Sequence, residues 1–202
     1  MSAAVTGATG SGGRRPRLVV GVSGSSAPHL GLAMLRALRE LGTVETHLVI
    51  SAGAERTIEL ELDEGIDALR SLADVVHDAR DLAAPISSGS FRTLGKVVAP
   101  CSMGRLAAIA NGTSDDLLAR AADVCLKERR PLVLATREAP LNLIHIRNME
   151  AATLAGATIF PPVPAFYHRP ATIDDLLAQT TGRILDQLGI EHWLFERWSG
   201  PS

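Results

Sequence analysis

One stretch near the N-terminus constrains the fold more than any other, because an apolar run stops abruptly at small residues and a helical pattern follows. Residues 18–22 are nearly continuous and rich in valine, as in a strand buried on both faces of a parallel sheet. Residues 23–26 read Ser-Gly-Ser-Ser, and residues 30–41 carry leucines at helical spacing before Gly42. The pattern predicts a strand, a tight turn and a helix, which is the first unit of an α/β fold.

The predicted turn suits an anionic ligand. Gly24 lets the backbone come close to a ligand, the hydroxyls of Ser23, Ser25 and Ser26 add donors, and the helix aims free N–H groups at the same point. Any tight strand-to-helix turn favours glycine and serine, so a purely structural turn is the alternative. The spacing is not G-x-G-x-x-G, and no acidic residue ends the second predicted strand, which favours a mononucleotide or phosphate monoester over NAD.

The same pattern repeats along the chain, which predicts a doubly wound, mostly parallel sheet flanked by helices. Further strands are expected at residues 44–50, 97–99, 131–136 and 158–160. Ser51 follows the second strand, and Ser102 with Met103 lies in the turn after the third. Because ligands of such folds bind at the carboxyl ends of the strands, Ser51 is a candidate for a second hydroxyl at the crevice. A serine at a strand end is common, so a purely structural Ser51 is the alternative.

The end of the fourth predicted strand carries the clearest chemical signal, since it delivers Arg137 and Glu138 into a loop closed by Pro140. Adjacent arginine and glutamate at this edge can supply an anion clamp and an acid/base. A surface ion pair is the alternative.

A predicted helix that begins at Asp115 and Asp116 and ends near Glu128 carries a stripe of alternating charge. Such a stripe usually forms a solvated, salt-bridged face. The alternative is that its cations reach a phosphate in the crevice. The stripe consists of Asp116, Arg120, Asp123 and Lys127.

The C-terminal third contains apolar segments that favour self-association. A helix is expected over residues 142–155, and a proline-rich but apolar segment, residues 161–170, is predicted to form an ordered lid carrying Tyr167. A last helix opens at Thr172, and the tail from His192 to Trp198 forms an apolar patch that favours a homo-oligomer. The residues of the 142–155 helix expected to face inward are Leu143, Ile146, Met149 and Leu154.

Length and composition narrow the classes of protein. The 202 residues are expected to form one domain over 17–202, preceded by a disordered tail, 1–16. A net charge of −2 gives no field for nucleic acid, and no apolar run is long enough for a membrane span or a secretory signal, so a cytoplasmic protein is expected. Cys101 and Cys125 lack metal-ligand spacing and are expected to be free thiols, and no metal is expected.

The order and wording of the later motifs resemble the UbiX-like (UbiX/Pad) flavin prenyltransferase family over about residues 17–198. The segments that carry the resemblance are residues 86–90 (Ile-Ser-Ser-Gly-Ser), 100–102 (Pro-Cys-Ser), 120–124 (Arg-Ala-Ala-Asp-Val), 126–134 (Leu-Lys-Glu-Arg-Arg-Pro-Leu-Val-Leu), 137–141 (Arg-Glu-Ala-Pro-Leu) and 161–170 (Pro-Pro-Val-Pro-Ala-Phe-Tyr-His-Arg-Pro).

The resemblance implies a flavodoxin-like (Rossmann-like) single domain that assembles into a dodecamer, with FMN between subunits. It implies transfer of a dimethylallyl group from dimethylallyl monophosphate to N5 and C6 of reduced FMN, without a metal. The product, prenylated FMN, would be passed to a UbiD-type decarboxylase. A non-catalytic FMN-binding subunit or carrier of such a decarboxylase is the alternative function.

The resemblance also implies roles for individual residues. Glu138 would be the acid/base, with Lys127, Ser26 and Tyr167 as the other catalytic residues, and Trp198 would contribute to an apolar shell. The residues implied for FMN are Ser23, Gly24, Ser25, Ser26, Ser51, Ser102, Met103 and Arg137, and those implied for the substrate phosphate are Ser90, Arg120, Lys127, Tyr167 and Arg183.

The chain departs from the family pattern mainly in the first turn. Ala27 stands where relatives have a glycine, Leu30 stands where they have an aromatic residue, and Ala52 replaces a frequent lysine. We therefore expect differences in FMN-phosphate geometry and in the prenyl pocket rather than in the reaction class.

Overall fold

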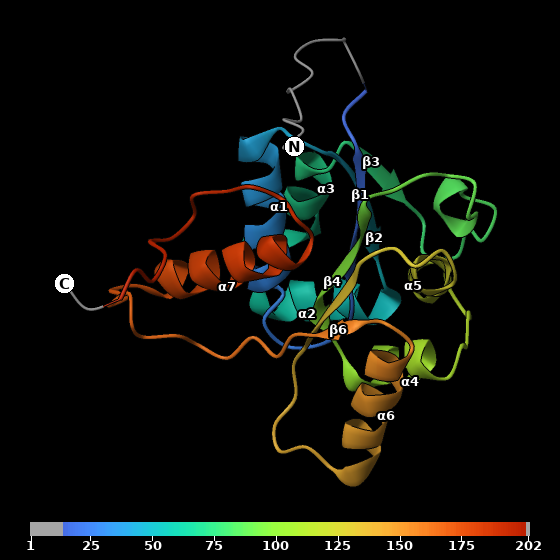
Figure 1. The fold of residues 1–202 in the computed structure, drawn as a ribbon. Coiled ribbons are helices and arrows are strands. Elements are labelled where there is room, and N and C mark those ends of the chain that lie inside the picture. The colour runs from blue at the N-terminus through green and yellow to red at the C-terminus, as the bar shows by residue number, and fades with distance from the viewer. Residues whose placement is uncertain (1–13, 201–202) are drawn as a thin grey trace, which may run out of the picture.

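The computed structural model describes residues 14–200 and contains a six-stranded sheet with helices on both faces (Figure 1). The strands are β1 (Arg17–Val22), β2 (Glu45–Ile50), β3 (Val75–His77), β4 (Gly95–Cys101), β5 (Leu132–Thr136) and β6 (Thr158–Ile159). The helices are α1 (His29–Leu41), α2 (Ala52–Glu61), α3 (Gly65–Leu72), α4 (Met103–Ala110), α5 (Leu117–Lys127), α6 (Leu143–Leu154) and α7 (Ile173–Gln187), with a short 3-10 turn, η1 (Pro85–Ser87).

All strand pairs are parallel, in the order β3-β2-β1-β4-β5-β6. The chain reverses its direction of winding between β1 and β4, so the turn after β1 opens at the switch point where such sheets bind ligands. This arrangement confirms the predicted flavodoxin-like, doubly wound α/β fold. The edge strand β3 was not predicted, because its three residues are too short for a recognisable alternation.

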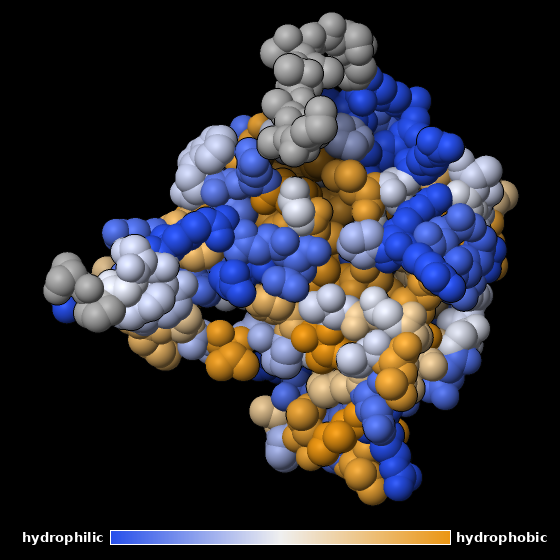
Figure 2. Space-filling view, in the orientation of Figure 1, coloured by the Kyte–Doolittle hydropathy of each residue, from blue (hydrophilic) through white to orange (hydrophobic). Residues whose placement is uncertain are grey.

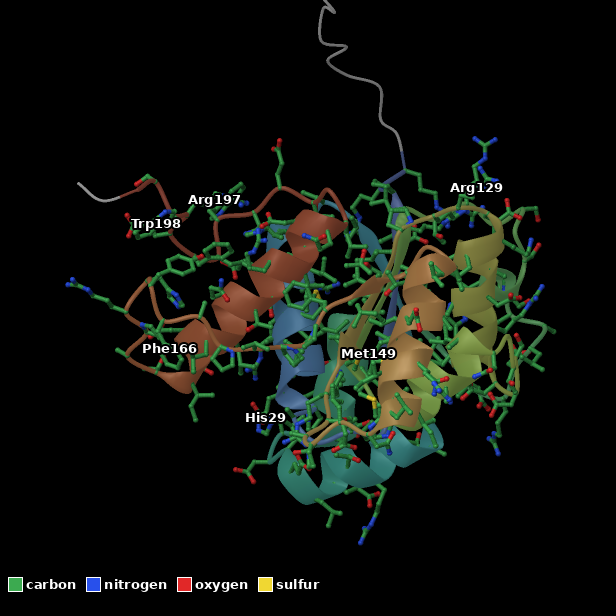
Figure 3. The ribbon with its side chains drawn as sticks, turned by 60° about the horizontal axis from the view of Figure 1, so that its bottom comes forward. His29, Arg129, Met149, Phe166, Arg197 and Trp198 are labelled. Atoms are coloured by element: carbon green, nitrogen blue, oxygen red, sulfur yellow. The ribbon has the colours of Figure 1, made fainter. Side chains whose placement is uncertain are left out.

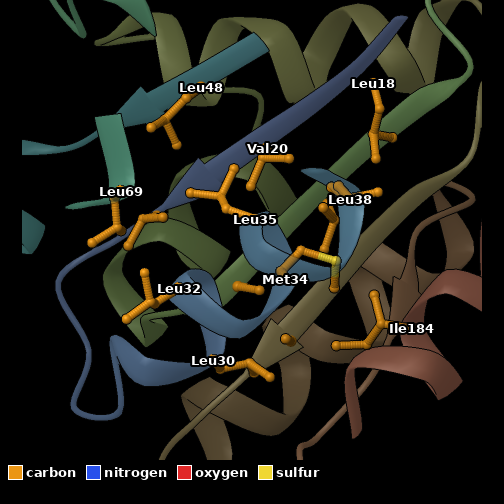
Figure 4. Packing of buried hydrophobic residues seen from close by; sticks show 14 of the residues in the cluster. Leu18, Val20, Leu30, Leu32, Met34, Leu35, Leu38, Leu48, Leu69 and Ile184 are labelled. Atoms are coloured by element: carbon orange, nitrogen blue, oxygen red, sulfur yellow. The ribbon is translucent and has the colours of Figure 1, made fainter. Parts of the chain in front are cut away.

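Alternate residues of the strands enter two separate cores. Leu18, Val20 and Val22 of β1 pack with α1, α3 and α7, as the close-up in Figure 4 shows for several of them. Val19 faces the other way and packs with α4 and α5. Helices α1 and α7 therefore cover one face of the sheet, and α4 and α5 cover the opposite face (Figure 1).

One charged side chain lies inside the second core. Lys96 of β4 is fully buried, and its Nζ donates a hydrogen bond of 2.7 Å to the backbone oxygen of Leu118. Burial lowers the pKa of Lys96 to about 8. Cys101 and Cys125 are also buried as free thiols, as predicted, and burial raises their pKa to about 12 and about 11.

Helix ends follow the capping residues of the sequence. Helix α1 ends at Gly42, which has φ of 62°. The side chains of Asp116 and Thr172 accept hydrogen bonds from the third residues of α5 and α7. The predicted starts of these helices are therefore confirmed.

The expected inward face of α6 was wrong. Leu143, Ile146 and Leu154 are 60%, 50% and 82% exposed, Met149 is only partly buried, and Ala152 is the buried residue of the helix. Figure 2 shows the resulting hydrophobic surface over α6. The leucine spacing is real, but it forms an apolar surface instead of a core contact.

Residues 14–16, which were expected to belong to the disordered tail, contact the rest of the fold. Arg14 forms an ion pair with Glu45, and Arg15 bonds to Asp74 and to the backbone oxygen of Val44. These contacts hold residues 14–16 against β2, whereas the rest of the expected tail, residues 1–13, lies outside the described residues. None of the helices in residues 14–200 is long and apolar enough to cross a lipid bilayer.

Candidate active site

The carboxyl ends of three neighbouring strands bring three serines together. Ser23 directly follows β1, Ser51 follows β2 and Ser102 follows β4. In the sheet, β1 lies between β2 and β4. The hydroxyl of Ser23 donates to the backbone oxygen of Pro100 at 3.0 Å and accepts from the backbone N–H of Ser102 at 2.8 Å. The strand-end serines, predicted from separate parts of the sequence, thus form one wall.

These serines line an open hollow of about 350 Å³, which Gly24 and Gly53 also line. Ser51 and Ser102 are the N-caps of α2 and α4, so both helices begin at the hollow. The first N–H groups of a helix have no acceptor within the helix and attract anions. The hollow therefore fits a phosphate ester held by backbone N–H groups and hydroxyls.

Close backbone contact narrows the hollow. A Cβ added to Gly24 would lie 2.7 Å from the backbone carbon of Gly53, so only glycine allows the turn after β1 to touch the start of α2. Met103, an expected FMN residue, has a buried side chain in the second core. Only its backbone, as the first residue of α4, can face a ligand.

The rest of the first turn is held by other parts of the chain. The Ser25 hydroxyl donates to the backbone oxygen of Arg137 at 3.0 Å, and the Ser26 hydroxyl donates to Glu61 at 3.0 Å. Ala27, one of the family departures, has φ of 70° and its N–H also donates to Glu61. The Ser25 contact ties the turn after β1 to the loop after β5.

That loop presents the predicted acid/base. Arg137 and Glu138 are both exposed, and they do not form an ion pair with each other in the described structure. The Glu138 carboxylate accepts only a hydrogen bond of 3.1 Å from the N–H of Ala139. The alternative of a surface ion pair between these neighbours is therefore wrong, and both side chains are available to a ligand.

Three of the expected phosphate-binding residues gather beside α5. Arg120 donates to the backbone oxygen of Ser87 at 3.2 Å, and the Ser90 hydroxyl bonds to Ser88 at 2.9 Å. The Lys127 ammonium lies close to Gly89: a Cβ added to Gly89 would be 2.7 Å from Nζ of Lys127. Within the charged stripe only Arg120 and Asp123 pair, because Asp116 bonds to Arg105 and Lys127 bonds to Glu128.

The other two lie beside α7. Tyr167 and Arg183 line an open hollow of about 610 Å³ together with residues of the C-terminal tail. The Tyr167 hydroxyl accepts a hydrogen bond from Gln179 at 3.3 Å. Since α5 and α7 cover opposite faces of the sheet, one chain does not bring Lys127 and Arg183 together.

Comparison with known proteins identifies the family. A family model described as Flavoprotein matches residues 8–185. Flavin prenyltransferase UbiX of Escherichia coli (strain K12) is 54% identical over 91% of this chain and 98% of its own length. UbiX of Thauera aromatica is 52% identical over 91% of this chain and 94% of its own. The chain belongs to the UbiX flavin prenyltransferase family. It is therefore an enzyme and a flavoprotein.

Solved structures of flavin prenyltransferase relatives have the same fold. AnUbiX, in complex with FMN and dimethylallyl pyrophosphate, superposes with a TM-score of 0.91 at 54% identity, covering 94% of this chain and all of that one. A dodecameric FMN-dependent UbiX-like decarboxylase from Escherichia coli O157:H7 gives 0.88 at 51% identity, covering 91% of this chain and all of the other.

Sequence reasoning missed one charged residue that lines the strand-end hollow. Arg105, in the first turn of α4, lines the strand-end hollow and forms a two-pronged ion pair with Asp116. Its Nε is buried and has no partner among the described residues. The signal available in the sequence was its position three residues after Ser102, where a helix N-terminus faces the crevice.

Proposed function

We propose that this chain transfers a dimethylallyl group from dimethylallyl monophosphate to N5 and C6 of reduced FMN. The observation that carries the proposal is the strand-end hollow, in which serines and two helix N-termini meet. The hydrogen bond from Ser25 to the backbone of Arg137 ties the loop that carries Glu138 to the turn that lines this hollow. Such a hollow fits the phosphate of FMN, and a relative of 54% identity holds FMN together with dimethylallyl pyrophosphate. We assign the FMN phosphate to Ser23, Ser51 and the backbone around Gly24 and Ser102.

The reaction requires two kinds of stabilisation. The allylic C–O bond breaks, so the departing phosphate gains negative charge while the prenyl carbon becomes electron-poor. When bound, reduced FMN supplies the nitrogen and carbon atoms that accept the prenyl group. Lys127, Arg120 and Arg183 would neutralise the phosphate, and hydroxyls of Ser90 and Tyr167 would donate to it.

Glu138 is assigned the proton transfers. Its carboxyl group can deliver a proton to the departing phosphate and accept the proton displaced when the new carbon bond forms. Arg137 belongs to the same loop and is assigned to the flavin, and Ser26 to the start of the prenyl pocket. An apolar surround that excludes water would protect the electron-poor prenyl group from hydrolysis.

The separation of α5 from α7 supports a site assembled between subunits. Lys127 and Tyr167 lie on different faces of one sheet, so a complete phosphate site needs groups from more than one copy. We propose a homododecamer, as in the dodecameric relative. We further propose that the prenylated flavin is passed to a UbiD-type decarboxylase, and that the chain acts in the cytoplasm.

The decisive experiment compares the wild-type protein with Glu138→Gln. The wild type, given reduced FMN and dimethylallyl monophosphate without added metal, should convert the flavin to a product heavier by one prenyl unit in mass spectrometry. Glu138→Gln should lower the rate by about a hundredfold or more, because general acid–base catalysis contributes at least this much. It should still bind FMN.

Two results would contradict the proposal. A wild-type protein that binds FMN but never changes its mass would point to a carrier without catalysis. A Glu138→Gln protein with wild-type rates would show that Glu138 is not the acid/base.

A further inference from the structure

A partly buried carboxylate in the last turn of α7 organises the C-terminal tail. Asp186 accepts a hydrogen bond of 2.7 Å from Arg183, one turn earlier on α7, and 3.1 Å separates it from Nε2 of His192. Arg197, from the tail, donates to both of its oxygens at 2.8 and 3.2 Å. We refer to Asp186, Arg183, His192 and Arg197 as the Asp186 cluster.

The Asp186 cluster is more than a surface ion pair. The His192 side chain is fully buried, and the Asp186 side chain is only 17% exposed. Burial raises the pKa of Asp186, but the bonds from Arg197, Arg183 and His192 outweigh it and hold the pKa below its usual value. Two guanidinium groups share one carboxylate, so the cluster keeps a net positive charge even with neutral His192.

Both arginines face one hollow. Arg183 and Arg197 line the space of about 610 Å³ with Tyr167, Phe195 and Trp198. The Arg197 guanidinium lies 5.5 Å from the centre of the Phe195 ring, and Tyr167 and Trp198 meet edge to face. Figure 3 shows Arg197 beside Trp198, next to α7. Aromatic rings and a net positive charge together fit a phosphate ester with a short apolar chain.

We propose that Arg197 binds the phosphate of the prenyl donor together with Arg183, and that Asp186 is the positioning residue that holds both guanidinium groups in place. The inference rests on the proposed function, in which Tyr167 and Arg183 serve the donor phosphate. Among the described residues, each arginine uses only part of its N–H donors on Asp186 and, for Arg197, on His192 at 3.4 Å, so further donors can reach an anion. A guanidinium fixed by one carboxylate loses less freedom when it binds a second anion.

The variant Asp186→Asn separates positioning from simple attraction, because the two ideas predict opposite results. Removal of the negative charge makes the hollow more positive, so attraction alone predicts tighter binding of the donor. Loss of positioning predicts weaker binding, since Arg183 and Arg197 are released. We expect weaker binding.

The measurement is calorimetric titration of dimethylallyl monophosphate into the dodecameric protein loaded with oxidised FMN, which avoids turnover. Asp186→Asn and Arg197→Gln should each raise the donor Kd about tenfold, with FMN affinity unchanged, as expected for a lost charged hydrogen bond. In turnover with reduced FMN, KM for the donor should rise more than kcat falls. Arg197→Lys, which keeps the charge, should recover part of the loss.

Glu59→Gln is the matched control. Glu59 pairs with Arg56 on the exposed side of α2, so this variant frees one arginine and removes one negative charge away from the hollow. It should leave the donor Kd unchanged. If Asp186→Asn lowers the melting temperature, Arg197→Gln decides the question, because the Arg197 side chain is 55% exposed and its loss leaves no cavity.

The outcomes are distinguishable. An unchanged or lowered donor Kd in both variants would overturn the inference while leaving the proposed function intact. A wild-type protein that neither binds the donor nor prenylates FMN would overturn the proposed function itself.

Discussion

Single residues were predictable where position alone decides their role. Ser23, Ser51 and Ser102 each follow an apolar strand, and parallel strands end at one edge, so the sequence placed them together. The ion pairs of Arg105 with Asp116 and of Asp186 with Arg197 gave no such signal, because the partners are eleven residues apart along the chain and meet only through the fold. Their roles follow from tertiary contacts.

Lys96 is a charged residue whose side chain lies fully buried in an apolar core. Its folded-state pKa of about 8 lies below the ordinary value of 10.5, so the unfolded chain binds more protons between these pH values. Stability from this site therefore rises as pH increases through that window, and at pH 7 the buried charge costs about 3 kcal/mol.

Lys96→Met should consequently raise the free energy of unfolding at pH 7 by about 1–3 kcal/mol, less than the full cost because the bond to Leu118 is lost. The gain should shrink by about 1 kcal/mol at pH 9, where the lysine is largely neutral in the folded state. Urea denaturation of both proteins at the two pH values measures this difference. A gain independent of pH would show that Lys96 does not titrate as described.

At the scale of elements, the buried strands and the helix starts were predictable, whereas the edge strand β3 and the buried face of α6 were not. Capping residues such as Asp116 and Thr172 mark helix starts through local hydrogen bonds, which the sequence contains in full. The apolar side of α6 has the same spacing whether it packs inside the chain or against another copy. Periodicity alone could not distinguish these two outcomes.

The contact between the turn after β1 and the start of α2 supplies a test at this scale. Gly24→Ala would place a methyl group 2.7 Å from the Gly53 backbone and should separate the two elements. We expect a loss of about 1–3 kcal/mol of stability and FMN affinity at least about tenfold weaker. Thermal unfolding and fluorescence titration with FMN measure both effects.

Gly53→Ala is the matched variant, because its added methyl group would lie at an ordinary 3.6 Å from Gly24. It should lose much less stability than Gly24→Ala. Equal losses in the two variants would mean that the close backbone contact is not what shapes the hollow.

At the scale of the whole molecule, the fold could be predicted from repeated strand, turn and helix units, whereas the completeness of the site could not. The motifs implied one phosphate site, yet a single chain holds Lys127 and Arg183 on opposite faces of the sheet. Because crossovers between parallel strands are right-handed, the face that a helix covers follows from the spatial order of the strands, which the sequence alone does not give. The family resemblance, with its subunit-spanning FMN, supplied what the residues alone did not.

The apolar surface of α6 should hold the assembly together. Ile144 is 68% exposed there, so Ile144→Lys would place a charge in the proposed contact and should shift the protein toward smaller species, with loss of prenyl transfer. Size-exclusion chromatography with light scattering gives the mass. Leu60→Lys, at a comparably exposed leucine of α2, is the control and should leave the mass unchanged. An unchanged mass for Ile144→Lys would exclude this surface as a contact.

The placement of Lys127 and Tyr167 on opposite faces of the sheet also affects how such a sequence can diverge. Under the proposed assembly, a copy lends Lys127 to one catalytic centre and Tyr167 to another. An inherited change in either residue would then damage chemistry carried out largely by neighbouring copies. Outer surfaces that would drift freely in a monomer become subject to the same selection as the catalytic residues.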